Sequence, residues 1–559
     1  MNLFKDLAEL YDELIKTDCY PLQILPLGYS TGEFDIEIEI NEKSEFINAH
    51  QLIKPTPKEQ KEGMINPRTT IIPVTEASAS RTTNSAPHLL FDSIQYLAKD
   101  FDEYKKFLKE EDKEKKSFFE DYINQLKELV KSNNNKYLNI FYKYISNNTL
   151  IKDLDNIDFF NKDDNGFFVD SIKGLFIRFT ITDSETNASY AFYKDVDFIK
   201  LFVNFYLEQN SMGKEIDYIT GNLCTPGKTF PKKIRNTGDN AKLFSSNDTS
   251  FYTFRGQFKN FEEACVIGKV TSDKAHNTLK FLIKNFSFTI NDKVFLIFSN
   301  TKNIKELNAR SFLTMDTSED FEDFKERNED NDIKNALLKD YAFEIKKKFL
   351  GIKNDLKLTN NPYIDIVILD AMTTGRLSIN YYKEYRGFQI NEFLENMEKF
   401  MIDTSWYNYF KDKKNNSIVH TYSNPSIINM ARSIYGIESD NYIGSSDKKV
   451  YDKTITELFK VILNNSHFDS NFVRALTYKT LKPTSFKNLY NWEKVVKIAC
   501  SVNRKYFNNK FKKEEIPLEM ENKSFHVFSC VSKLIVWHTA TIKICWNIAR
   551  IINGIKKFA

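Results

Sequence analysis

The sequence predicts a multi-domain α+β protein, with a mixed α/β N-terminal body over residues 1–388 and a C-terminal helical bundle over residues 389–559. Two observations predict this fold class. Strand patterns recur before about residue 388, and beyond it the hydrophobic residues follow a helical period almost throughout. A chain of 559 residues is long enough to form several domains, each with its own core.

The N-terminal body opens with an amphipathic helix, because apolar residues recur at helical spacing in "LFKDLAELYDEL". The turn "PLGYS" at residues 26–30 leads to "FDIEIEI" at residues 34–40, whose alternation is typical of a half-exposed strand. Residues 54–88 predict a loop rich in Pro, Thr, Ser and Ala. The charged stretch after it predicts one or two long helices with a narrow apolar stripe.

Strand patterns return over residues 166–207 and again in "KVFLIFS" and "IDIVILDA". After residue 388 the segments "INEFLENMEKFMI", "TITELFKVILNN" and "LYNWEKVVKIACSVNRKYF" have the period of helices. We therefore expect the second part of the chain to be a helical bundle.

Composition excludes several classes of protein. The net charge is only +3, from 79 cations and 76 acids, so attraction to an anion must come from local clusters. Six cysteines without CxxC spacing do not support a zinc ribbon, and seven histidines show no HExxH, so no metal or cofactor is expected. The apolar run "LIVWHTATI" is too short to span a membrane, which predicts a soluble cytoplasmic protein.

The segment "GNLCTPGKT" resembles a phosphate-binding P-loop, but five residues separate its glycines where that motif needs four. The polar loop that follows, the central loop at residues 226–248, is more informative about function. Between residues 228 and 242 it has five cations and one acid. Clustered Lys and Arg attract a polyanion, and Asn, Ser and Thr donate hydrogen bonds to phosphate. Composition alone leaves open a surface loop that pairs with its own acids or packs on another protein.

Longer motifs make the chain resemble a known family. "KIRNTGDNAKLFSSNDTSFYTFRGQF" and "SDKAHNTLKFLI" resemble the central signature of the large subunit of the type I-C CRISPR Cascade complex. "LAELYDEL", "PLGYS", "SAPHLLFDSIQYLA" and "DAMTTGRLSINYYKEY" are similar to further landmarks of that family, in the same order. The C-terminal segment over residues 524–544 departs from the family's Gly-Arg-Leu helix motif, and about 40 residues there are atypical.

The resemblance implies a large subunit that is not an enzyme. It implies recognition of the protospacer-adjacent motif on double-stranded DNA, help in opening the duplex, stabilisation of the R-loop, and presentation of the target to a separate helicase-nuclease. The implied partners are guide RNA, target DNA, the backbone and guide-end subunits, and a small helical subunit made from an internal start. Met397, Met401 and Met430 are candidate starts, and each is equally a candidate core residue.

The resemblance and the loop's composition together name the candidate nucleic-acid-binding residues. Those expected to contact phosphates are Lys232, Lys233, Arg235, Lys242 and Lys259. Those expected to contact base edges or an unpaired strand are Asn236, Asn247 and Arg255, with turn formation as the alternative for both asparagines. Secondary candidates are Arg81, Asn84 and Arg376, followed by Gly28 and Tyr29. No catalytic residue is expected.

Two other functions fit the sequence less well. A nuclease or another nucleic-acid enzyme would need an acid–base or metal cluster, which the residues do not suggest. A structural adaptor would use the same basic loop to bind guide RNA or other subunits.

Overall fold

The computed structural model describes residues 2–16, 24–56, 66–81, 85–108, 116–147, 149–183, 185–186, 188–211, 213, 215–236, 239–244, 255–301, 309, 338–373, 375–411, 418–438, 443–445 and 448–511. The chain divides into two compact units. The first comprises Met1–Asn285 with Asp370–Ile379, and the second comprises Phe286–Leu369 with Asn380–Ala559.

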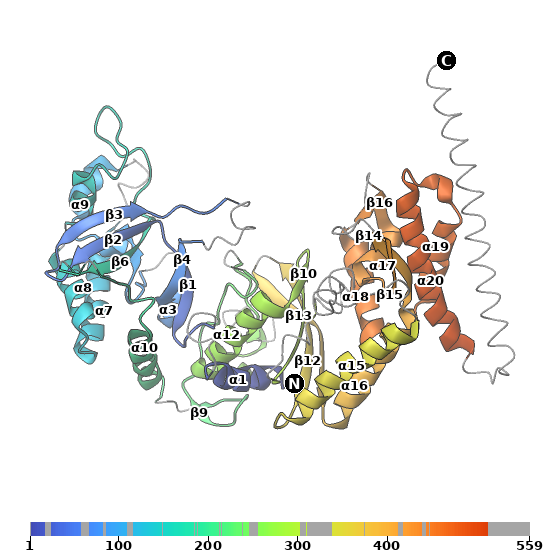
Figure 1. The fold of residues 1–559 in the computed structure, drawn as a ribbon. Coiled ribbons are helices and arrows are strands. Elements are labelled where there is room, and N and C mark those ends of the chain that lie inside the picture. Colours follow the sequence, from blue (N-terminus) through green and yellow to red (C-terminus); the bar gives the residue numbers. More distant parts are fainter. Residues whose placement is uncertain are drawn as a thin grey trace, which may run out of the picture. The chain divides into compact units, whose positions relative to one another are not determined.

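The first unit is built on a five-stranded sheet of order β3-β2-β6-β5, with β7 paired to β6 (Figure 1). The strands are β2 (Ile36–Asn41), β3 (Phe46–Gln51), β5 (Asp92–Ser93), β6 (Phe176–Thr182) and β7 (Ser189–Tyr190). The alternation that predicted β2 is confirmed, because its three isoleucines are buried while the residues between them are partly exposed. β2 pairs with β6 in parallel, which joins segments far apart in the sequence.

Helices pack on this sheet through aromatic side chains. They are α4 (Ile94–Leu97), α5 (Phe101–Tyr104), α7 (Phe119–Ser132), α8 (Lys136–Asn147) and α9 (Leu150–Asn156), with the 3-10 turn η1 (Lys105–Phe107) after α5. Phe141 of α8 meets Phe179 of β6 edge-on, with ring centroids 5.1 Å apart. Where the sequence predicted one or two long helices, α4 and α5 are single turns before the longer α7.

The strand pattern expected up to residue 207 is wrong after β7, because the chain forms α10 over Val196–Gln209. Asp195 caps this helix by accepting hydrogen bonds from the backbone N–H groups of Asp197 and Phe198. Its buried residues lie on one helical face and are Phe198, Ile199, Phe202 and Tyr206. Aromatic and β-branched residues favour strands in general, but here the spacing of the buried residues prevails.

The remaining elements of the first unit lie before and after the central loop in the sequence. They are α1 (Leu3–Leu14), β1 (Tyr29–Glu33), β4 (Thr69–Pro73), α3 (Glu76–Ser80), β8 (Glu215–Ile216), β9 (Leu223–Cys224), η2 (Arg255–Gln257), α11 (Phe261–Ala264) and α12 (Lys269–Phe286). The helix predicted at the N-terminus is confirmed as α1, and β1 pairs antiparallel with β4.

The second unit contains a four-stranded sheet of order β10-β11-β12-β13. Its strands are β10 (Phe288–Ile290), β11 (Lys293–Ser299), β12 (Tyr363–Thr373) and β13 (Arg376–Arg386), and α15 (Leu338–Lys357) precedes β12. β11 and β12 are the strands predicted from "KVFLIFS" and "IDIVILDA".

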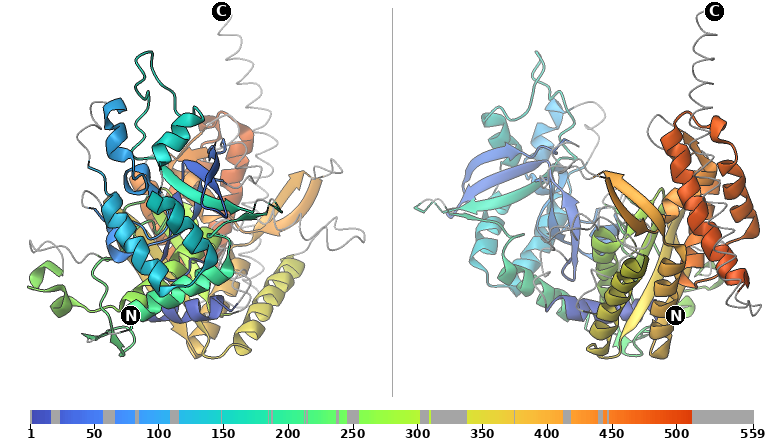
Figure 2. Two further views of the ribbon diagram at one scale, coloured as in Figure 1. Left: turned by 90° about the vertical axis from the view of Figure 1, so that its left-hand side faces the viewer. Right: turned by 45° about the vertical axis from the view of Figure 1, so that its right-hand side comes forward.

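The later part of the second unit is mainly helical (Figure 2). Its helices are α16 (Phe388–Thr404), α17 (Ile427–Tyr435), α18 (Lys448–Leu463), α19 (Ser470–Thr480), η3 (Pro483–Ser485) and α20 (Leu489–Phe511). Two short antiparallel pairs interrupt them, β14 (Trp406–Lys411) with β15 (Ile418–Ser423), and β16 (Gly436–Glu438) with β17 (Ile443–Ser445). The predicted α+β fold class is therefore confirmed, while the domain boundary at residue 388 stays a prediction.

The candidate start methionines Met397, Met401 and Met430 all lie in the hydrophobic core of the second unit, at no more than 7% exposure. In the described part of the chain, no helix combines the length and the apolar character that crossing a bilayer requires.

Candidate nucleic-acid interface

The described residues of the first unit enclose a pocket of about 640 Å³. Its walls come from the turn and strand at residues 28–34, from α3 and the residues beside it, from residues 229–233 of the central loop, and from α12. The structure thus brings together features that the sequence analysis named separately. The predicted residues in the lining are Gly28, Tyr29, Arg81, Lys232 and Lys233.

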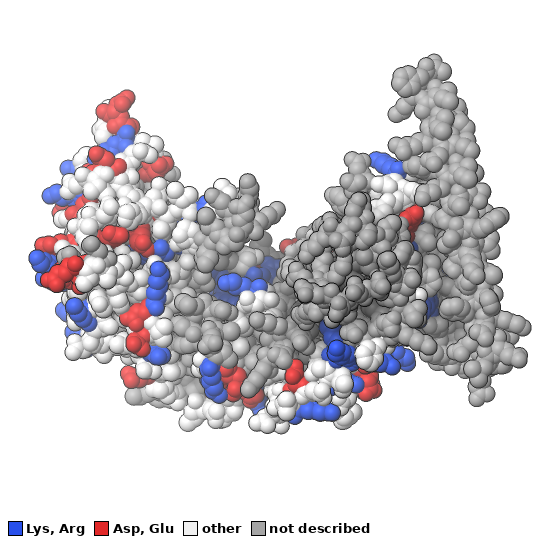
Figure 3. All heavy atoms as spheres, viewed as in Figure 1, with Lys and Arg blue, Asp and Glu red and all other residues white. Residues whose placement is uncertain are grey.

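The pocket is positively charged, although the protein as a whole is nearly neutral. The charged residues that line it are Lys54, Arg81, Lys232, Lys233, Lys269 and Lys280, against Glu33 and Asp273. Elsewhere on the first unit, around β2, β3 and α7–α9, basic and acidic side chains are interspersed (Figure 3). An excess of cations in a concave site raises the local concentration of anions there.

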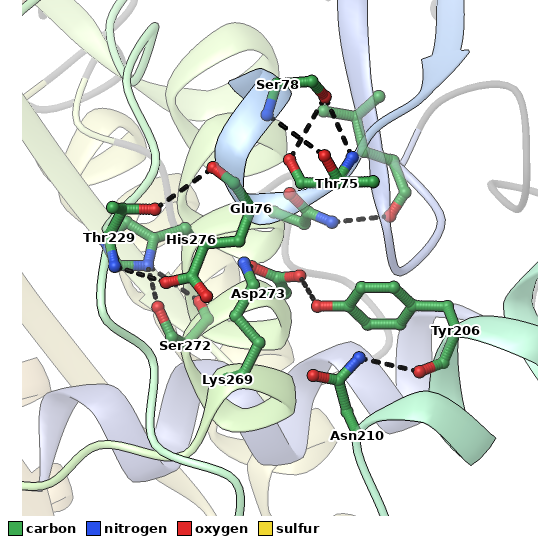
Figure 4. A network of polar contacts seen from close by, with 12 residues as sticks. Thr75, Glu76, Ser78, Tyr206, Asn210, Thr229, Lys269, Ser272, Asp273 and His276 are labelled. Atoms are coloured by element: carbon green, nitrogen blue, oxygen red, sulfur yellow. Dashed lines mark hydrogen bonds and ion pairs between the residues drawn. The ribbon is translucent and has the colours of Figure 1, made fainter. Parts of the chain in front are cut away.

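The Asp273 carboxylate is already neutralised by its neighbours. The Lys269 ammonium lies 2.9 Å from its Oδ1, and the Tyr206 hydroxyl donates a hydrogen bond of 2.5 Å to its Oδ2 (Figure 4). The pKa of Tyr206 is raised far above its usual value, first by burial and then by this negative charge. Asp273 therefore holds the wall together and cancels the charge of Lys269.

Lys233 lines the pocket with an unusual backbone conformation. Its φ is 56°, in the left-handed region that a lysine rarely adopts, and its N–H donates to the carbonyl oxygen of Asp239. Its ammonium donates to the carbonyl oxygen of Thr31 at 3.2 Å. Burial lowers the pKa of Lys233; the Glu33 charge opposes this, and the Lys232 charge adds to it.

Arg235 has a bracing position in the loop. Its Nε and one terminal nitrogen lie 2.8 and 3.1 Å from the two carboxylate oxygens of Asp239, and its side chain is 15% exposed. Burial alone would raise the pKa of Asp239, but the hydrogen bonds from Arg235 and from the Ala241 N–H leave it below its usual value. Here the loop does pair with its own acid, and the predicted phosphate contact by Arg235 stays a prediction.

Arg81 lines the pocket but is bound to a buried acid. Its two terminal nitrogens lie 2.6 Å from the two oxygens of Asp92, whose side chain is fully buried. Its guanidinium also lies over the Tyr96 ring, 4.5 Å from the centroid. Burial lowers the pKa of Arg81, but Asp92 and Tyr96 together raise it by more than burial lowers it. The pKa of Arg81 therefore lies above its usual value.

Two more predicted residues meet at the tip of the β12–β13 hairpin. The Lys242 N–H donates to the carbonyl oxygen of Gly375 at 3.2 Å, and its carbonyl accepts from the Leu377 N–H at 3.0 Å. This bridges Lys242 to Arg376, whose side chain is exposed. The central loop is thus anchored to the hairpin by backbone bonds, and burial lowers the pKa of Lys242.

The other predicted residues lie outside the pocket lining. Asn236 and Lys259 are exposed. The backbone of Arg255 lies in η2, and Asn84 and Asn247 fall outside the described residues. Binding by each of these residues stays a prediction.

The sequence analysis missed the wall that α12 contributes. Lys269, Asp273, Asn277 and Lys280 all line the pocket. Their spacing of four, four and three residues places them on one face of a helix. This spacing could have been found in "SDKAHNTLKFLI" and the residues before it, but the pocket they face comes from segments up to 250 residues earlier.

The same helix fixes the "PLGYS" turn. The Asn277 amide donates to the carbonyl oxygens of Leu25 and Pro26 at 3.0 and 3.3 Å. Gly28 has φ +74°, and a Cβ there would lie 2.7 Å from the Tyr206 ring. The position needs glycine both for its backbone angle and for this close approach.

α3 contacts the central loop, and a capping box fixes the start of this helix. Thr75 accepts a hydrogen bond from the Ser78 N–H, and the Ser78 hydroxyl accepts one from the Thr75 N–H, which forms a capping box (Figure 4). The Glu76 carboxylate accepts from the Thr229 N–H. These contacts set the position at which the central loop enters the pocket.

Comparison with known protein families identifies the family of this chain. The pattern of the family described as CRISPR-associated protein (Cas_Csd1) matches residues 7–527. The match covers all the pocket-lining residues and ends within the segment 524–544 that departs from the expected motif. A search of curated proteins finds no significant match. Because the family pattern spans nearly the whole chain, the protein belongs to the Csd1 family of CRISPR-associated proteins.

Proposed function

We propose that this chain is the non-catalytic large subunit of a type I-C Cascade complex, and that it recognises the protospacer-adjacent motif on double-stranded DNA. It would aid duplex opening, stabilise the R-loop and present the target to a helicase-nuclease recruited afterwards. In such systems the protein reads a short flanking motif while guide pairing reads the remaining sequence.

The observation that carries the proposal is the cationic pocket in a chain of this family. Lys232 and Lys233 of the central loop and Lys280 of α12 line it together. Lys232 forms no hydrogen bond or ion pair with other residues of the described part of the chain. A site of this kind supplies charge and donors for a phosphate backbone, which is what holding DNA requires.

The proposed partners follow from family membership. They are guide RNA, target DNA, and the backbone and guide-end subunits of a ribonucleoprotein in the prokaryotic cytoplasm. A small helical subunit made from an internal start is part of the proposal. Since Met397, Met401 and Met430 are core residues here, intact-mass measurement of the purified complex distinguishes a start from a packing role.

Replacing Lys232 with alanine is expected to lower the salt dependence of DNA binding. If its ammonium contacts one phosphate, the slope of log affinity against log salt falls in magnitude by about one unit. The measurement is a titration of the reconstituted complex with target duplex at several salt concentrations. The matched control is Lys131→Ala, because Lys131 is an exposed lysine on α7 paired with Glu128. An unchanged slope for Lys232→Ala would remove this loop from the DNA interface.

A further inference from the structure

Lys280 is a half-buried lysine whose ammonium has no ion-pair partner among the described residues. It lies on the pocket face of α12, and its side chain forms no hydrogen bond or ion pair with the residues that the structure describes. Its pKa is lowered to about 8, mainly by burial. The Asp273 charge opposes this shift, and the charges of Lys233 and Lys269 contribute to it. Partial burial of an ammonium that has no ion-pair partner costs stability, so this arrangement does not stabilise the free protein.

The other walls of the pocket are suited to an organic group attached to an anion. Aromatic side chains in the lining are Tyr29, Phe34, Phe176, Tyr206 and Phe230. The volume of about 640 Å³ lies within the usual range for small-molecule sites. A nucleotide combines a phosphate with a base that can contact aromatic rings, but a base inside a duplex cannot enter a pocket unless it leaves the stack.

We propose that the pocket binds one nucleotide of an unpaired strand, with the ammonium groups of Lys280 and Lys233 contacting its phosphate and the aromatic wall contacting its nucleoside. The inference deepens the proposed function, because it assigns to this pocket a strand that has left the duplex. Lys232 at the pocket edge contacts the neighbouring phosphate.

The test uses the full-length chain and the variant Lys280→Met. Methionine keeps an unbranched side chain and removes the charge, so we expect unchanged or increased thermal stability. The probes are an oligothymidylate of about eight nucleotides, a hairpin duplex, thymidine 5′-monophosphate and inorganic phosphate. The control is Lys274→Met on the same helix, because Lys274 pairs with Asp12 and does not line the pocket.

We expect the oligothymidylate to bind the wild-type chain more tightly than the hairpin or the mononucleotide, and Lys280→Met to weaken it about tenfold or more. Lys274→Met should bind as the wild type does. Equal affinity for oligothymidylate in Lys280→Met and wild type would overturn the proposal. If thymidine monophosphate binds as tightly as the oligonucleotide, the ligand is a free nucleotide and the assignment to a strand is wrong.

The pH dependence adds a readout that a structural role would not produce. The ammonium must be protonated to bind phosphate, so wild-type affinity should fall by up to about tenfold from pH 7 to pH 9. Lys280→Met should lose most of this decrease. The other charged and titratable groups that line the pocket are Lys269 and Asp273 on α12, Lys232 and Lys233 on the loop, Tyr29 and Glu33 on β1, and Lys54, Arg81, His88 and Tyr206.

Failure here is separable from failure of the proposed function. The complex could show the expected salt slope with duplex target while Lys280→Met leaves single-strand binding unchanged. That result would reject the nucleotide pocket alone. If instead the salt slope is unchanged in Lys232→Ala while Lys280→Met weakens single-strand binding, duplex recognition through Lys232 is rejected and the pocket is retained.

Discussion

Replacing Arg81 with alanine is expected to destabilise the first unit by about 3–5 kcal/mol, because it leaves a buried carboxylate without its counter-ion. Asp92 is fully buried, and Arg81 contacts both of its oxygens at 2.6 Å. Asp92 also accepts hydrogen bonds from the N–H groups of His88 and Ser93, which cannot replace the lost charge. The ion pair thus joins the end of α3 to β5, which pairs with β6.

The measurement is denaturant unfolding of the full-length chain, followed by a probe in the first unit. Arg474→Ala is the matched control, since Arg474 is exposed on α19 and forms no ion pair in the described part of the chain. The double variant Arg81→Met with Asp92→Asn should recover much of the loss, because it removes both charges. Equal stability of Arg81→Ala and Arg474→Ala would contradict the account. Loss of DNA binding by Arg81→Ala is informative only if the unit remains folded.

Acidification is expected to destabilise the first unit through His276. Burial lowers its pKa to about 4. Its Nδ1 lies 2.7 Å from the Ser272 carbonyl oxygen, so the neutral ring donates there, while its Nε2 is buried without a partner in the described residues. The unfolded chain binds this proton near pH 6.5 and the folded chain near pH 4. Stability is therefore fully present above pH 6.5 and falls by about 3 kcal/mol as the pH drops to 4.

The check is unfolding free energy against pH for the wild type and for His276→Gln, whose amide can donate to Ser272 but does not titrate in this range. The variant should have a smaller decrease between pH 6.5 and pH 4. His88 supplies a remaining decrease, because burial lowers its pKa to about 4 as well. Identical pH profiles would show that the imidazole of His276 is not held neutral.

Local patterns predicted much of the fold. The alternation in β2 and the helical spacing in α1 were sufficient, because each element buries one face and its sequence records that face. α10 was misassigned because Phe198, Phe202 and Tyr206 are aromatic residues that fit either period. The parallel pairing of β2 with β6 joins residues about 140 positions apart, which no local pattern encodes.

Only part of the candidate site could be predicted from the sequence. Clustering of charge identified Lys232 and Lys233, since they are neighbours in the sequence. The roles of Arg235 and Arg81 depend on the acids that fold against them, and composition does not reveal such pairing. Lys280 looks like an ordinary helix residue in the sequence, and it becomes notable only because three other segments line the pocket that it faces.

The central claim is that the loop around Lys232 and Lys233 lies against target DNA. A photoreactive amino acid at the exposed position Asn236 of this loop tests the claim most directly, in a complex reconstituted with guide RNA and labelled target DNA. The account predicts crosslinks to DNA at or beside the flanking motif. Crosslinks confined to protein subunits or to guide RNA would contradict it.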